Sequence, residues 1–145
     1  MRRQRVEYLH LPPETTPAPL EKLPRRMIVL VEADVSNDWQ NDVSEWIIES
    51  GCLFMMAWGR DCSSWDDSVD WANLERFDFE PIPEEATVMT TWHEDDSLEE
   101  VFDFDVRCAF HQTTEMPLVT IVHIADEPRR DDLLQQYQRI ALREG

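Results

Sequence analysis

Residues 27–31 read MIVLV and residues 52–58 read CLFMMAW, and these two stretches decide the fold. Each is an unbroken apolar run of strand length, and the first is rich in β-branched side chains. An unbroken apolar run is typical of a strand that is covered on both faces, as strands of parallel sheets are. The two stretches therefore predict a sheet with helices on both sides.

A helical pattern follows each of these strands. Ser36 is a favourable N-cap, and apolar residues then recur at helical spacing (Trp39, Val43, Trp46 and Ile47) until Gly51 ends the helix. A Ser/Asp-rich turn at 62–67 begins a second, shorter helix, which ends before Pro81. We expect its apolar face to consist of Val69, Leu74 and Phe77.

The same rhythm continues to the C-terminus. Residues 86–92 and 118–124 are predicted strands, and Ser97 and Glu100 form a capping box that begins a helix after the first of them. Asp131 begins a last helix. Strands that alternate with helices indicate right-handed crossovers in a parallel sheet. We predict an α/β fold, a mostly parallel four- to five-stranded sheet flanked by helices in a Rossmann-like or flavodoxin-like three-layer sandwich.

The length of 145 residues suits a single domain. Residues 1–25 contain five prolines and several basic residues, and we interpret them as a basic, proline-rich N-terminal arm. Within the arm, residues 6–11 alternate and could pair as an edge strand. Residues 26–145 then form a single acidic α/β domain.

The net charge of −18 is unevenly distributed, since residues 61–105 contain 16 acids and one arginine, Arg76. Such a surface repels phosphates and anionic lipid, so we expect no direct nucleic-acid binding and no membrane binding, and it attracts a basic protein or a cation. Solubility alone is the simpler explanation. The sequence has no apolar run of membrane-spanning length and no signal-like start, and we expect a cytoplasmic protein. A homo-oligomer is left open.

The three cysteines are far apart and lack metal-binding spacing, which argues against a disulfide framework and a zinc site. Cys52 and Cys108 fall in apolar patterns and are expected to be buried. Cys62 follows a strand end, where a nucleophile could lie, but no activating base stands beside it.

Three blocks resemble a known family: residues 46–59 (WIIESGCLFMMAWG), 61–73 (DCSSWDDSVDWAN) and 89–95 (MTTWHED). They look like an uncharacterised bacterial family of small acidic Rossmann-like domains with no assigned activity. The resemblance covers roughly residues 25–140 and leaves the N-terminal arm outside. It implies the fold and a bacterial cytoplasmic origin, and it carries no catalytic residue to this chain.

Polar side chains follow every predicted strand, and in a parallel sheet these carboxyl ends share one edge, where ligands bind. Histidines and carboxylates there could hold a divalent cation or supply an acid and a base. Helix caps and solvated acids are the simpler explanation. The candidate catalytic residues are Asp34, Asp61, His93, Glu94 and His123, and the candidate metal ligands are Asp34, Asp61, His93 and His123. No glycine-rich phosphate loop is present, so we expect no dinucleotide or other cofactor beyond that cation.

Tryptophans and carboxylates alternate in residues 58–73. Indole rings supply contact area and acids attract basic side chains, a combination that suits a protein-binding surface. Packing of some of these rings on the sheet is the alternative. The candidate partner-binding residues are Trp58, Asp61, Trp65, Asp66, Asp67, Asp70, Trp71 and Trp92.

The sequence favours an acidic protein-binding module that engages a basic partner, of the immunity, inhibitor or regulatory-subunit type. The alternative is a metal-dependent hydrolase with a carboxylate/histidine site at the carboxyl edge of the sheet. A structural subunit that docks through its proline-rich arm is a third hypothesis.

Overall fold

A five-stranded sheet in which every neighbouring pair is parallel forms the centre of the computed structural model, which describes residues 5–144. The strand order is β1-β5-β2-β3-β4. The strands are β1 (Arg5–Leu11), β2 (Arg25–Val31), β3 (Cys52–Gly59), β4 (Met89–His93) and β5 (Leu118–Ile124).

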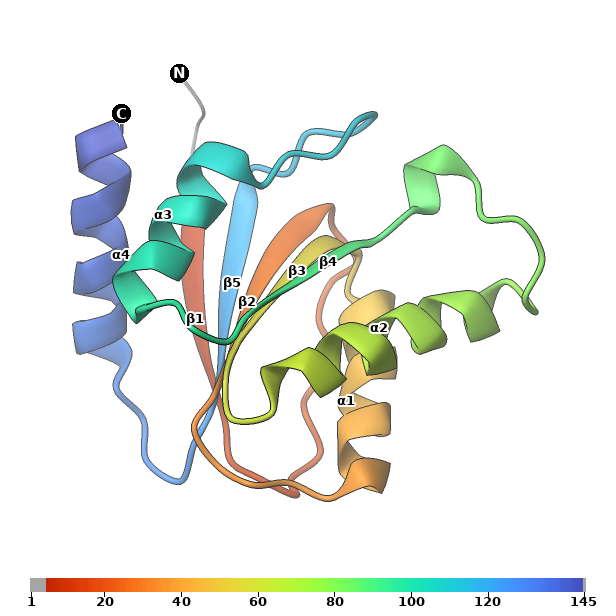
Figure 1. The fold of residues 1–145 in the computed structure, drawn as a ribbon, viewed down its shortest axis with the longest axis horizontal. Coiled ribbons are helices and arrows are strands. Elements are labelled where there is room, and N and C mark those ends of the chain that lie inside the picture. The colour runs from red at the N-terminus through yellow and green to blue at the C-terminus, as the bar shows by residue number, and fades with distance from the viewer. Residues whose placement is uncertain (1–4, 145) are drawn as a thin grey trace.

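Two helices cover each side of the sheet (Figure 1). Helices α1 (Asn37–Glu49) and α2 (Cys62–Arg76) lie on one side, and α3 (Leu98–Cys108) and α4 (Arg130–Glu144) lie on the other. The predicted three-layer α/β sandwich is therefore confirmed. A short 3₁₀ turn, η1 (Glu84–Ala86), precedes β4. Among residues 5–144, every helix is too short or too polar to cross a bilayer.

The direction of the chain reverses once across the sheet. From β2 the chain steps outward through α1 to β3 and through α2 to β4, then returns through α3 to β5 on the other side of β2. Right-handed crossovers require this change of direction to move the helices to the opposite face. The carboxyl ends of β2 and β5 consequently form the switch point, where ligands of such sheets bind.

Most of the predicted N-terminal arm is joined to the domain. Strand β1 pairs with β5 along its whole length, as expected for an edge strand at 6–11. Residues 12–24 then run along α1, where Trp39 Nε1 donates to the Thr15 carbonyl (2.7 Å) and Trp46 Nε1 donates to the Ala18 carbonyl (2.9 Å). Residues 1–4, which include Arg2 and Arg3 of the predicted basic arm, lie outside the described residues.

Two sequence predictions need correction. The strand predicted at 86–92 begins at Met89, because η1 occupies its first residue. The apolar face of α2 is not formed by Leu74, which is 37% exposed, or by Phe77, which is half-buried. Val69 is buried as predicted, and Trp65 and Ala72 are buried with it, at the i, i+4, i+7 spacing of one helical stripe.

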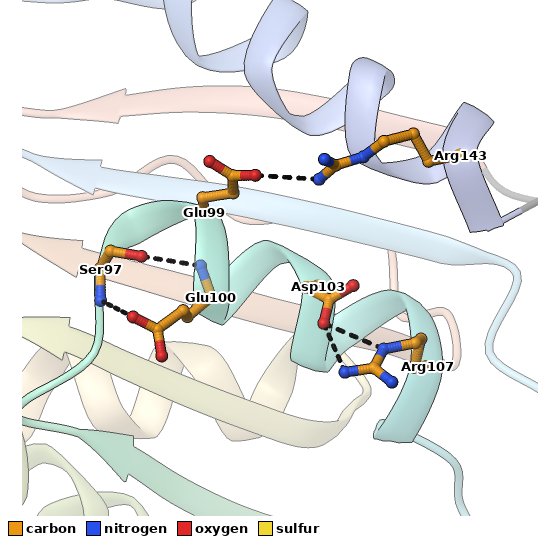
Figure 2. A pocket seen from close by; sticks show the side chains of 6 residues that line it. All are labelled: Ser97, Glu99, Glu100, Asp103, Arg107 and Arg143. Carbon is orange, nitrogen blue, oxygen red and sulfur yellow. Dashed lines mark hydrogen bonds and ion pairs between the residues drawn. The ribbon is translucent and has the colours of Figure 1, made fainter.

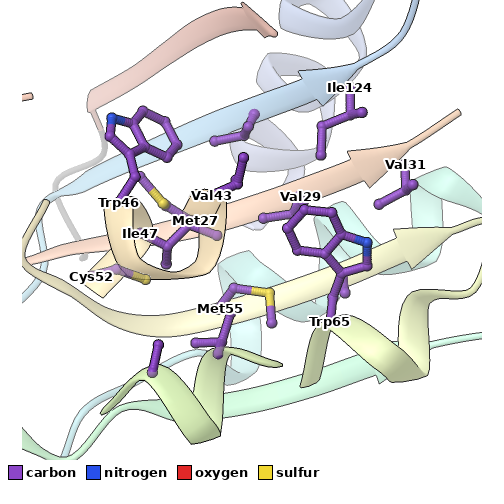
Figure 3. Packing of buried hydrophobic residues seen from close by; sticks show 14 of the residues in the cluster. Met27, Val29, Val31, Val43, Trp46, Ile47, Cys52, Met55, Trp65 and Ile124 are labelled. Carbon is purple, nitrogen blue, oxygen red and sulfur yellow. The ribbon is translucent and has the colours of Figure 1, made fainter. Parts of the chain in front are cut away.

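Aromatic side chains fill the layer between the sheet and the first two helices (Figure 3). Trp46 of α1 and Trp65 of α2 face Met27, Val29 and Met55 of the central strands. As predicted, the helical spacing that starts at Trp39 directs one side of α1 into this layer. These large rings fill much of the layer on this side of the sheet.

Two consecutive arginines at the start of the central strand are buried on opposite faces of the sheet. Arg26 is fully buried, and its Nε lies 2.8 Å from Asp105 Oδ1 of α3. Tyr137 of α4 donates to the other oxygen of Asp105 (2.5 Å). Arg25 bonds Glu7 of β1 (3.0 Å), the Ser50 carbonyl (3.0 Å) and the Glu21 carbonyl. These groups link β2 to β1 and to both helical layers.

We predict that Asp105→Asn lowers the free energy of unfolding by about 3–5 kcal/mol, because it removes the negative charge that lies 2.8 Å from the buried Arg26 guanidinium. Asp103→Asn on the same helix is the matched control. It removes an exposed i,i+4 pair with Arg107, and a loss of about 0.5 kcal/mol or less is expected. Urea titration of both variants measures the difference, and equal losses would contradict a structural role for the buried pair.

Candidate functional site

The two candidate histidines lie at the same edge of the sheet but do not meet. His93 of β4 is in register with Trp58, Trp58 with Leu30, and Leu30 with His123 of β5. The histidines are thus three strand spacings apart, which is about 14 Å between backbones. The expected common edge is confirmed, but a single ion cannot bind both side chains.

His93 is held by its own neighbours. The side chain is 7% exposed, its Nδ1 lies 2.8 Å from Asp96 Oδ2, and its Nε2 lies 2.9 Å from Thr91 Oγ1. Its ring packs edge-on against Phe104 of α3. Both ring nitrogens and one ring face are therefore used within the fold.

The three candidate carboxylates are on the surface. Asp34 is almost fully exposed and lies 3.4 Å from the exposed Arg60. Asp61 precedes α2 with a left-handed backbone (φ 50°) and makes no capping hydrogen bond, and Glu94 is exposed. In the part of the chain that the structure describes, no three His, Cys, Asp or Glu side chains are grouped as metal ligands would be.

A different set of side chains meets at the switch point, around His123. His123 is fully buried, its Nδ1 lies 2.6 Å from the Tyr8 hydroxyl, and its Nε2 lies 2.5 Å from Glu32 Oε1. Arg129 closes the network, since its guanidinium donates to Glu32 (2.7 Å) and its backbone N–H donates to the Tyr8 oxygen (3.0 Å). The network joins β1, β2, β5 and the segment that precedes α4.

The partners assign the protons in this network. Because the ionised Glu32 carboxylate can only accept, His123 Nε2 carries a hydrogen and donates it to Glu32. In the neutral ring Nδ1 then accepts from the Tyr8 hydroxyl, whose oxygen accepts from the Arg129 backbone N–H. Burial lowers the pKa of His123 and raises that of Tyr8. Burial also opposes ionisation of Glu32, but hydrogen bonds from His123 and Arg129 outweigh it and lower the pKa of the carboxyl. The network therefore favours a neutral histidine beside a charged carboxylate.

We predict that His123→Gln reduces the pH dependence of stability. The pKa of His123 is below its ordinary value of 6.5 in the folded chain, so just below that pH the unfolded chain binds a proton that the folded chain does not. Stability should consequently fall as the pH drops through this window, and it should fall less in His123→Gln than in the wild type. Urea titrations at about pH 7.5 and about pH 5.5 measure the difference. The same drop in both proteins would contradict this assignment; Glu32 contributes only below 4.5.

The cysteines differ from the expectation at one position. Cys52 is buried as predicted, but Cys108, at the end of α3, is exposed. Cys62 is buried at the start of α2, and burial raises the pKa of its thiol, which is the opposite of what a nucleophile requires. Burial also raises the pKa of Cys52 to about 12.

We predict that Cys108 alone reacts rapidly with Ellman's reagent in the native protein, because the two other thiols are buried and protonated. The measurement is the absorbance of the released thiolate at about pH 8, where an exposed thiol is partly ionised. Cys108→Ser should abolish the fast phase, and denaturant should expose Cys52 and Cys62. A fast phase that persists in Cys108→Ser would show that a buried thiol is accessible.

A cavity of about 530 Å³ lies against α3 and α4. Figure 2 shows that its lining groups bond one another: Ser97 with Glu100 in the predicted capping box, Asp103 with Arg107, and Glu99 with Arg143. Both of its arginines are therefore paired with carboxylates, and we assign no ligand to this cavity.

The exposed apolar surface is concentrated elsewhere. Among residues 5–143, seven large apolar side chains are exposed, and five of them lie on α2, β4 or the segment between them: Trp71, Leu74, Phe79, Met89 and Trp92. Trp71 and Phe79 are 57% and 56% exposed and pack edge to face, with ring centroids 5.1 Å apart. Single exposed apolar residues are ordinary, whereas a group of exposed rings makes this surface a candidate for binding.

Helix α2 and strand β4 are joined at this surface. Thr90 donates to Asp70 (3.0 Å), and burial together with the neighbouring Asp66 and Asp67 raises the pKa of Asp70. Helix α2 connects two parallel strands, so it runs in the direction opposite to β4. Two residues forward along β4, from Thr90 to Trp92, therefore match about one helical turn back along α2 from Asp70. We name as the α2–β4 face two adjoining parts of this surface: Asp66 and Asp70 on the side of α2 toward Trp92 of β4, and Asp67, Trp71, Glu75 and Phe79 on the neighbouring outward side of α2.

Three predicted partner-binding residues lie outside this face. Trp65 is 1% exposed and packs against Trp39 in the core, and Trp58 is half-buried with its Nε1 bonded to the Asp96 carbonyl (2.8 Å). Asp61 is exposed at the start of α2, outside the face. The prediction that Trp65 contacts a partner is wrong, because this residue lies on the buried stripe of α2. Trp71 lies nearly two turns further along the helix, on the side that faces away from the sheet.

The position of Phe79 depends on unusual backbone. Asp78 and Phe79 both have positive φ (51° and 60°), and their N–H groups donate to the Glu75 and Leu74 carbonyls in a Schellman closure of α2. Glycine normally takes the left-handed position, and other residues cost about 1–2 kcal/mol each. Backbone strain of this kind collects at functional sites. The closure holds the Phe79 ring against Trp71.

Sequence reasoning missed several of these residues. Tyr8 and Arg129 are brought to His123 by the pairing of β1 with β5, and no local pattern indicates that pairing. Glu75 carries a usable signal, because it lies four residues after Trp71 and eight after Asp67, on one side of a helix. Phe79 could have been found as an aromatic residue directly after a helix end.

Residues 6–140 match a family described as a domain of unknown function (DUF7684). The chain belongs to this family. The DUF7684 match begins inside β1, so residues 6–24, which we placed outside the resemblance, are part of the family domain. No curated protein and no solved structure matches the chain.

Proposed function

We propose that this DUF7684 chain is a protein-binding module whose α2–β4 face engages a basic partner protein, in the manner of an immunity protein, an inhibitor or a regulatory subunit. The observation that carries the proposal is the exposed, edge-to-face Trp71–Phe79 ring pair beside the carboxylates of α2. Tryptophan is enriched at the energetic centres of protein interfaces, and a rim of one charge selects partners of the other.

Charge supports a basic partner. Residues 61–105, which include α2 and β4, contain 16 acids and only Arg76. On α2 itself, Asp67, Asp70 and Glu75 are exposed. The raised pKa of Asp70 reflects burial and repulsion by its neighbours, and a cationic side chain would relieve that repulsion. A basic partner would therefore bind this face with a favourable electrostatic energy that an acidic or neutral partner would not have.

Backbone strain also supports a role for Phe79. The ring is more than half exposed, although its position requires two consecutive left-handed residues. Burial of the Phe79 ring does little to offset the free-energy cost of this strain, because more than half of the ring is exposed to water. Contact with a partner would bury the Phe79 and Trp71 rings together.

We predict that Asp67→Lys/Glu75→Lys reduces capture of a basic protein by the tagged full-length chain at least about tenfold, because two attractive charges become repulsive. The matched control is Asp42→Lys/Glu49→Lys, which makes the same charge change on the exposed side of α1. Capture from a lysate of the source organism is quantified by mass spectrometry. A Trp71→Ala/Trp92→Ala variant tests the aromatic part, and unfolding curves verify that each variant is folded.

The two pairs of charge variants separate a specific face from general acidity. Loss of capture in the α2 variant with retention in the α1 control supports the face. Equal capture by all variants, or equal loss in the α1 control, would remove the α2–β4 face as the binding site. Raising the salt concentration should weaken capture by the wild type, since charge attraction between exposed groups is screened.

A further inference from the structure

Strand β4 leaves one edge of the sheet unpaired. In the described part of the chain it pairs with β3 alone, and it is the last strand in the order β1-β5-β2-β3-β4. Its residues are only partly buried apart from His93, and Met89 and Trp92 are 45% and 50% exposed. Helix α2 packs against one of its faces, and Phe104 of α3 contacts His93 on the other. The backbone groups on that edge are open to another strand.

The edge also lacks the usual protection against pairing. Natural edge strands carry charged residues, prolines or bulges that prevent another strand from adding. Strand β1, at the other edge, contains Arg5 and Glu7 and is followed directly by Pro12 and Pro13. Strand β4 reads MTTWH, has no Lys, Arg, Asp, Glu or Pro, and pairs with β3 without a bulge. Thr and Trp are moreover favourable strand residues.

Charge decides which strand could add there. Exposed acids stand at both ends of β4, with Glu84 and Glu85 before it and Glu94 and Asp95 after it, and Asp70 contacts its middle through Thr90. A second copy of this chain would bring the same acids against them, and like charges at close range oppose association. A basic segment would meet opposite charge at each end.

We propose that the partner adds an extended basic segment as a sixth strand along the free edge of β4, with alternate side chains reaching the α2–β4 face. This proposal rests on the proposed function and names how the partner binds. Strand addition uses backbone hydrogen bonds for affinity and alternate side chains for specificity. Trp92 of β4, on the side of the sheet that α2 covers, is positioned to contact those side chains.

The test uses the full-length protein and a synthetic peptide of about seven residues that alternates Arg and Val, compared with the same peptide methylated at alternate backbone nitrogens. Methylation keeps the charge and removes the donors that strand pairing needs. We expect the unmethylated peptide to bind at least about tenfold more tightly in calorimetry, since several backbone hydrogen bonds are lost in the other. We also expect it to slow amide hydrogen exchange in Met89–His93.

Matched variants check the charges at the edge. Glu94→Lys/Asp95→Lys should weaken binding of the Arg/Val peptide about tenfold, and Asp42→Lys/Glu49→Lys on α1 should leave it unchanged. Equal binding of the two peptides without protection of β4 would overturn strand addition and leave charge-driven docking on α2 intact. Absence of peptide binding would also overturn it. The capture experiment tests the proposed function separately: unchanged capture by the Asp67→Lys/Glu75→Lys variant would contradict the proposed function, whatever the peptide result.

Discussion

Burial of two adjacent positive charges in the central strand is the constraint on which the rest of the structure depends. Arg25 and Arg26 start β2 and point to opposite sides of the sheet, so each needs a partner from a different layer. Asp105 of α3 pairs with Arg26 and also accepts from Tyr137 of α4. Glu7 of the edge strand β1 pairs with Arg25. A buried charge without a partner is strongly destabilising, so the elements that carry these partners must dock together.

The two ends of the parallel sheet serve different purposes in this fold. At the amino end, the arginines hold the layers together. At the carboxyl end, where comparable sheets bind ligands, Tyr8, His123, Glu32 and Arg129 bond one another, and this network occupies both nitrogens of the histidine. The buried polar groups at both ends thus bond one another inside the domain. The exposed aromatic side chains lie mainly at the side, on the α2–β4 face.

Composition and geometry converge at that side. The segment with the greatest excess of acids contains both the exposed Trp71–Phe79 ring pair and the edge strand β4, which has no acidic, lysine or arginine side chain. Repulsion among the acids disfavours self-association through an edge that would otherwise invite it, because strands without protective charges pair readily. The acidic surroundings can thus protect β4 in the free protein and attract a basic segment at the same time.

The sequence by itself determined the layers: unbroken apolar runs such as 27–31 predict strands covered on both faces, and the spacing from Trp39 to Ile47 and the capping box at Ser97 place helices between them. These signals are local, with periods of a few residues. Only the tertiary structure decided that Arg25 and Arg26 are buried, that Trp65 is core while Trp71 is surface, and that His93 and His123 are separated by two strands. Strand order and register bring together residues more than a hundred positions apart, such as Tyr8 and His123, and no local pattern encodes that pairing.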